Sequence, residues 1–136
     1  MSWDIFVQDL PQDAKTIEDI PSDFRGAPIG MRSDVIAKIK EVVPDADFCN
    51  PSWGHIVGPD WSIEVNIGEN EVCDGFALHV RGSKGAIKAI EAILDRLQLR
   101  AIDTAAPGGF YVAGESAEAS HTKWRAYRDQ VAEGGK

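Results

Sequence analysis

Four polar residues in two neighbouring segments are the first candidates for chemistry. Glu64 and Asn66 lie in one segment of alternating apolar and polar residues, and His79 and Arg81 lie in the next. A carboxylate beside an imidazole can orient the ring and raise its pKa, as general base catalysis sometimes requires. An arginine next to such a pair can bind an anion.

Two interpretations of these side chains stay open. They could form a contact surface for a ligand or partner, or Glu64, His79 and Arg81 could serve a small enzyme or metabolite-binding domain. No serine or cysteine in a recognisable nucleophile motif accompanies them. Opposite charges on adjacent strands are also common on solvated sheets and contribute about 1 kcal/mol at most. We therefore favour the contact surface and assign no catalytic residue.

Other motifs predict no cofactor and no metal. Gly82-Ser83-Lys84-Gly85 is shorter than a P-loop or a dinucleotide fingerprint, and Ser83 as a helix N-cap explains it. The histidines have no partner at a zinc-ligand spacing, and the acidic run after Pro44 lacks the glycine and terminal glutamate of a calcium loop.

The tryptophans differ in their expected surroundings. Trp53 lies among proline, serine and glycine in an expected loop, which makes it the best candidate for an exposed aromatic side chain, although a loop tryptophan more often packs onto the core. Exposed tryptophan is typical of binding hot spots, so Trp53 joins Glu64, Asn66, His79 and Arg81 as a candidate binding residue. Trp3 and Trp61 are expected in the core, and Trp124 is expected to pack its helix onto the domain.

The two alternating segments predict a β-hairpin. Alternation of period two is typical of a strand with one buried face, and the glycine-bounded stretch 68–75 is the expected loop. Centring the hairpin on that loop sets its register, because a slip of one residue would turn every apolar side chain outward. The expected cross-strand pairs are Ile63–Val80, Val65–Leu78, Ile67–Phe76, Glu64–His79 and Ser62–Arg81.

The rest of the chain supplies helices and further strands. Helices are expected over 33–43, with Ser33-Asp34 as its cap, over 84–97 and over 116–131; short strands are expected over 2–8, 55–57, 99–102 and 110–112. A long ordered loop, about 9–31, has Ile17, Ile20, Phe24 and Ile29 as apolar anchors, and a tail of about 132–136 should fray. This order predicts one α+β domain spanning 1–136, with helices packed on one face of an antiparallel sheet. Our first choice is a ferredoxin-like plait with an added C-terminal helix.

Net charge and cysteine content limit the expected partners and cellular location. The net charge of −8 argues against a sequence-independent nucleic-acid binder and is compatible with a basic protein partner. No apolar run is long enough to span a bilayer, and no leader is visible at the N-terminus. With two widely spaced cysteines, we expect a cytoplasmic protein with reduced thiols.

The segments SWDIFVQDLP, GPDWSIE and FALHVRG are together similar to a family of small uncharacterised bacterial proteins. The resemblance covers most of the chain and implies a free-standing bacterial domain. It implies no activity and supplies no functional residue. The acidic charge, the polar sheet face, the long anchored loops and the absence of a catalytic motif lead us to expect a non-enzymatic binding module. A toxin-neutralising, immunity-type protein is its specific form, by analogy with a class of small acidic proteins.

Overall fold

The computed structural model describes the backbone of residues 1–134 and the side chains of residues 1–131. A five-stranded antiparallel sheet has the order β3-β4-β6-β1-β7. Its strands are β1 (Trp3–Gln8), β3 (Trp53–Val57), β4 (Trp61–Asn66), β6 (Gly75–Gly82) and β7 (Arg100–Asp103). The other elements are β2 (Gly30–Met31), β5 (Val72–Cys73), a 3-10 turn (Ile17–Asp19), α1 (Arg32–Val42), α2 (Ala86–Leu97) and α3 (Glu115–Gly134).

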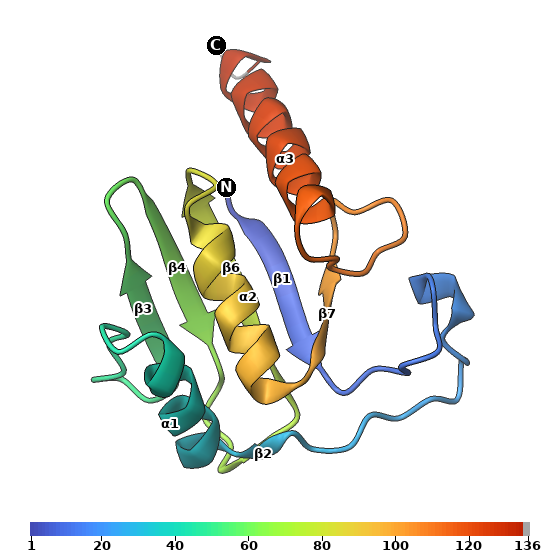
Figure 1. Cartoon of the computed structure of the whole chain (residues 1–136), viewed down its shortest axis with the longest axis vertical. Helices are drawn as coiled ribbons and strands as arrows, with labels where there is room; N and C mark the ends of the chain where they lie inside the picture. The colour runs from blue at the N-terminus through green and yellow to red at the C-terminus, as the bar shows by residue number, and fades with distance from the viewer. Residues whose placement is uncertain (135–136) are drawn as a thin grey trace.

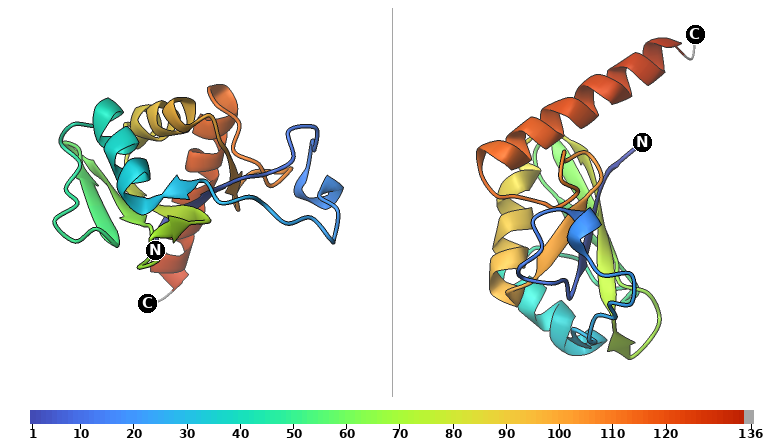
Figure 2. Two further views of the ribbon diagram at one scale, coloured as in Figure 1. Left: turned by 90° about the horizontal axis from the view of Figure 1, so that it is seen from below. Right: turned by 90° about the vertical axis from the view of Figure 1, so that its right-hand side faces the viewer.

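Helices α1 and α2 lie side by side on one face of this sheet, and the opposite face is left open (Figures 1 and 2). Without β3, the sheet order β4-β6-β1-β7, with a helix after β1 and another after β6, is that of the ferredoxin-like plait. Strand β3 extends the sheet beyond β4. The prediction of an α+β fold with helices on one sheet face is confirmed.

The predicted hairpin register is confirmed. Ile63 pairs with Val80 and Glu64 pairs with His79, so the apolar residues of both strands face the helices. Four of these apolar side chains are completely buried: Ile63, Val65, Leu78 and Val80. The loop between the strands is more structured than expected, because it contains β5, which pairs with β2.

The two helices on the sheet begin differently from the prediction. Helix α1 begins at Arg32, directly after Met31, and no side chain caps it, so Ser33-Asp34 is not its cap. Helix α2 begins at Ala86, and the Ser83 hydroxyl instead donates a hydrogen bond of 2.7 Å to Asp60. The Ser83 oxygen also accepts a hydrogen bond of 3.3 Å from the Gly85 N–H, so Ser83 stabilises the turn before α2 and does not cap the helix itself.

The glycine that ends β6 has a conformational reason. Gly82 has a φ of 93°, in the left-handed region that favours glycine. A Cβ there would also collide with the backbone of Asp60 and Trp61. The carbonyl of Gly82 accepts a hydrogen bond of 2.9 Å from His121 Nε2, which ties this turn to α3.

The buried residues of α3, among those whose side chains are described, lie in its first half. Ala117, Ser120, His121 and Trp124 are buried, whereas Tyr127 is 58% exposed. The helix starts above α2, crosses the end of the sheet and extends past the open face (Figure 2, right). The tail expected to fray, about 132–136, lies outside the residues whose side chains are described.

Segments outside the helices cover both edges of the sheet. At one edge, Asp47 forms a two-way backbone bridge with His55 of β3. At the other, Phe110 forms a bridge with Ile102 of β7. This single bridge replaces the strand expected over 110–112.

The long loop before β2 folds against the β7 edge. Leu10 and Ala14 are buried there with Phe110. Ile17, which was expected to anchor the loop, is 45% exposed and is held through its backbone N–H, which donates to the Gly108 carbonyl.

Candidate functional site

The open face of the sheet brings together all five candidate binding residues. The register places Trp53 beside Asn66 and places Glu64 beside His79, while Arg81 lies beside Ser62. These side chains come from three adjacent strands, β3, β4 and β6. The predicted pattern of one apolar and one polar sheet face therefore assembles the candidate residues as expected.

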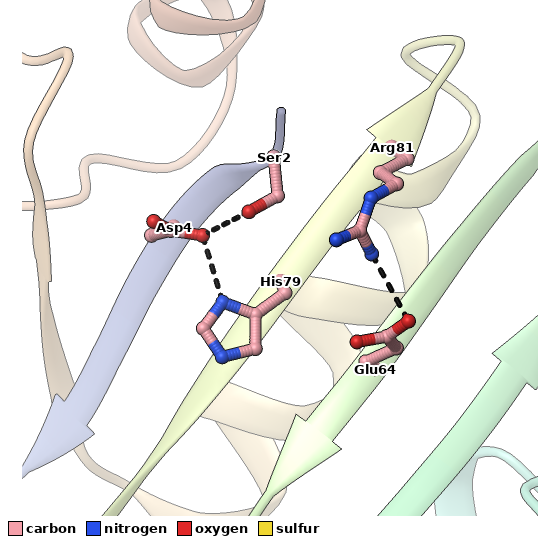
Figure 3. A network of polar contacts seen from close by, with 5 residues as sticks. All are labelled: Ser2, Asp4, Glu64, His79 and Arg81. Carbon is pink, nitrogen blue, oxygen red and sulfur yellow. Dashed lines mark hydrogen bonds and ion pairs between the residues drawn. The ribbon is translucent and has the colours of Figure 1, made fainter.

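His79 is held in a network that reaches a further strand, β1 (Figure 3). Its Nδ1 lies 2.8 Å from Asp4 Oδ1, and the Ser2 hydroxyl donates to the same oxygen. The side chain of His79 is 21% exposed and that of Asp4 is 36% exposed. The ring is thus fixed by a carboxylate while part of it still faces solvent.

Glu64 has a different partner from the one that the sequence suggested. Its Oε1 lies 3.2 Å from Arg81 Nη1, diagonally across the hairpin, and both side chains are about one-third to one-half exposed. Although Glu64 and His79 are neighbours in the register, the carboxylate that contacts the imidazole belongs to Asp4. An ion pair at this exposure contributes roughly 0–1 kcal/mol to folding.

Trp53 is a half-buried residue at the start of β3, and the prediction of an exposed loop tryptophan is wrong. Its ring stacks on the His79 ring, with centroids 6.0 Å apart and planes 22° apart. Gly54, which suggested a loop, is a residue of β3. A glycine is required there because the Phe48 ring occupies the space where a Cβ would lie. The stack fixes both rings as one aromatic patch on the open face.

The order of hydrogen bonds argues against a serine hydrolase at this network. A catalytic triad needs the histidine between the serine and the carboxylate, so that the imidazole can take the hydroxyl proton. Here Asp4 lies in the middle and the Ser2 hydroxyl donates to it. The network can orient an imidazole and present it to a partner, but Ser2 has no base in the required position.

Sequence reasoning missed Asp4, Ser2 and Phe6. Asp4 and Phe6 alternate with the buried residues of β1, and Phe6 remains 37% exposed on the open face. The alternation of residues 2–8 contained this signal, since it places positions 4 and 6 opposite to Trp3 and Ile5. The alternation did not indicate which strand lies next to β1.

The structure gives little support for a function of the remaining motifs. Among the described residues, no group of three or more histidine, cysteine or acidic side chains lies close enough to hold a metal ion. Asp60 at the Gly82-to-Gly85 turn places a carboxylate where a bound phosphate would need cations. Cys49 and Cys73 are free thiols.

Asp47 and Cys49, in the loop before β3, both have shifted pKa values. The backbone N–H of Cys49 donates to the Asp47 carboxylate and lowers its pKa. The Asp47 side chain in turn raises the pKa of the Cys49 thiol, by hydrogen bonding and by its charge. Cys49 is therefore less reactive than an ordinary exposed thiol.

Two cavities combine charged and aromatic side chains. One, about 490 Å³, lies between α2 and the β7 edge and includes Glu91, Arg100 and Tyr111. Another, about 310 Å³, lies between the start of β1, the end of β7 and α3, and includes Trp3, Trp124 and Tyr127. A further cavity of about 360 Å³ beside Ile17 and Pro107 has no aromatic side chain in its lining. None of these three is lined by Glu64, His79 or Arg81.

Comparison of the chain with known protein families, curated proteins and solved structures found no match. The resemblance of the chain to an uncharacterised bacterial family stays a prediction. Within the described residues, none of the helices has both the length and the apolar character needed to cross a bilayer.

Proposed function

We propose that this protein is a non-enzymatic binding module whose open sheet face contacts a protein partner. The observation that carries this proposal is the aromatic and polar patch centred on the stacked rings of Trp53 and His79. Asp4 holds the imidazole in place through its Nδ1. Phe6 adds exposed apolar area on the same face. Rigid aromatic side chains with a polar surround are typical of the energetic centre of protein interfaces.

The mode of contact that fits this architecture is docking on the face. Partners that add a strand to a sheet need a free edge with unpaired backbone groups. The bridges Asp47–His55 and Ile102–Phe110 cover the middle of both outer strands. A face contact leaves these bridges in place.

Charge favours a basic partner. The net charge is −8, and opposite charge accelerates association and selects partners. The specific form that we propose is a cytoplasmic, toxin-neutralising protein of the immunity type. This form rests on analogy with a class of small acidic proteins and not on a residue motif.

The proposal is tested by capturing the partner on the immobilised protein and measuring its affinity for variants. Trp53→Ala and Arg81→Ala should each weaken binding about thirtyfold, since a central aromatic or arginine contact contributes about 2 kcal/mol or more. Lys88→Ala, on the exposed side of α2, is the matched control and should change nothing. Circular dichroism confirms that each variant is folded.

Two outcomes decide against this function. Equal affinities for Trp53→Ala and Lys88→Ala would show that the open face is not the contact surface. A robust turnover of substrate that is lost in His79→Ala would favour an enzyme that uses the Asp4–His79 pair as a base. For the immunity-type form, co-expression should protect a cell from the toxicity of the basic protein that is captured, and no protection would exclude it.

A further inference from the structure

The cavity beneath α3 has the composition of a small-ligand site. Three aromatic side chains, Trp3, Trp124 and Tyr127, line it together with Lys123. Its volume of about 310 Å³ lies at the lower end of the range of roughly 300–1,000 Å³ for ligand pockets. Such pockets are mostly apolar and carry a few polar groups that orient the ligand.

One of those polar groups has no partner in the protein. Trp124 is 6% exposed, and its indole Nε1 makes no hydrogen bond with the described residues. By contrast, the indole of Trp3 donates to Asp103 Oδ1 at 2.8 Å. The Nε1 atom is closed off from solvent, so an acceptor on an occupant reaches it only after the Trp124 ring turns toward the cavity. A buried N–H without an acceptor is unfavourable, so that contact would stabilise the bound state.

The charge next to the cavity selects an anionic acceptor. Lys123 lines the cavity and forms no ion pair with the described residues. Arg125 lies on the same helix, whereas the charge of Arg128 is paired with Asp129. Asp103, whose Oδ2 also lacks a partner, does not line the cavity.

The larger cavity does not offer such groups. There, Glu91 already accepts hydrogen bonds from the Tyr111 hydroxyl and from the Gly114 N–H. Arg100 donates to the carbonyls of Pro11 and Ala14. Its charged groups are thus occupied by the protein itself, which leaves the cavity beneath α3 as the better candidate.

We propose that the cavity beneath α3 binds a small aromatic carboxylate. The ring of the ligand packs among Trp3, Trp124 and Tyr127, and its carboxylate lies against the Lys123 ammonium, where a turn of the Trp124 ring lets the indole N–H donate to it. Aromatic rings gain from stacked or edge-to-face packing beyond the area that they bury, and a charge-assisted hydrogen bond adds direction. This site shares Ser2 with the His79 network, but Trp53, His79 and Arg81 do not line it, so binding in the cavity is tested separately from the proposed function.

The test is a titration of the ¹⁵N-labelled protein with indole-3-acetate, followed by NMR. The chain has four tryptophans, so four indole N–H signals report at once. The Trp124 signal should move most, while that of Trp53, on the open face, should stay in place. Uncharged indole and cationic tryptamine should bind at least about tenfold more weakly, the loss expected for one charge-assisted contact.

Matched variants separate the role of Lys123 from a general effect of charge. Lys123→Gln should weaken binding of indole-3-acetate about tenfold, whereas Arg125→Gln removes the same charge from the same helix and should change affinity less than about twofold. Tyr127→Ala, at an exposed position, should also weaken binding without unfolding the protein. The proposal is overturned by an unmoved Trp124 signal at millimolar ligand, by equal effects of the two charge variants, or by tryptamine binding as tightly as indole-3-acetate.

Discussion

His79 Nδ1 lies 2.8 Å from Asp4 Oδ1, although the two residues are 75 positions apart in the chain. An ionised carboxylate only accepts hydrogen bonds, so Nδ1 is the donor of this pair. In the neutral ring, Nε2 is then left as an acceptor on the open face. The pair therefore determines which nitrogen a partner meets.

The tautomer of His79 gives the first prediction. Asp4→Asn should alter the ¹⁵N shifts of the His79 ring, because the amide can donate or accept and no longer enforces one tautomer. Stability should fall by less than about 1 kcal/mol, since both side chains are partly exposed. A long-range ¹H–¹⁵N spectrum and a urea melt measure the two effects, with Asp45→Asn as control. Unchanged ring shifts would contradict the role given to Asp4.

Helix α2 gives a prediction about stability. Ile90 is completely buried, and Ile90→Ala should cost about 2–5 kcal/mol, the range for deleting a large buried side chain. Lys88 is exposed on the same helix, and Lys88→Ala should cost less than about 0.5 kcal/mol. Urea denaturation of both variants gives the difference directly. Equal losses would mean that a different face of α2 packs on the sheet.

Tyr111 gives a prediction at alkaline pH. Burial, the hydrogen bond to Glu91 and nearby negative charge raise the pKa of Tyr111. A raised pKa favours the neutral phenol in the fold, so this stabilisation is complete below the unfolded value of about 10 and is lost as the pH rises through the folded pKa. Tyr127→Phe leaves Tyr111 as the sole tyrosine. In this variant, absorbance at 295 nm should rise only as the protein unfolds, and ionisation near pH 10 in the folded protein would show that the phenol is accessible.

Cys49 gives a prediction about thiol reactivity. The Asp47 side chain raises the pKa of Cys49, so the thiolate fraction at neutral pH is reduced. Asp47→Asn should therefore speed alkylation of Cys49 by iodoacetamide, at about tenfold for each unit by which the pKa falls. Asp45→Asn, on the same exposed loop, is the control. Mass spectrometry should show no modification of buried Cys73 before unfolding, and equal rates in the two variants would exclude the Asp47 contact.

Local patterns determined which parts of this fold were predictable. The register of β4 and β6 follows from alternation on both sides of one short loop, and it places Glu64 beside His79. Gly54 led to an error, because a glycine shortly after Pro51 suggests a loop, while its actual role is to admit the Phe48 ring. Only the packed structure reveals which close contact a glycine permits.

Contacts between distant segments could not be predicted in the same way. The pairing of β1 with β6 brings Asp4 to His79, and neither segment alone specifies its neighbour. The same holds beneath α3, where Trp3, His121 and Trp124 pack together from opposite ends of the chain. The candidate face was therefore predictable as a set of residues, but its hydrogen-bond network was not.

The bridges at Asp47 and Phe110 also bear on how this protein behaves when it is concentrated. An exposed outer strand is a template on which other chains can add, and this is a common route to amyloid. Here the N–H and C=O groups of His55 are already paired with Asp47. Before another chain could add to an outer strand of the native fold, the residues near Asp47 or Phe110 would have to detach. Those two short segments therefore oppose aggregation through the sheet edges.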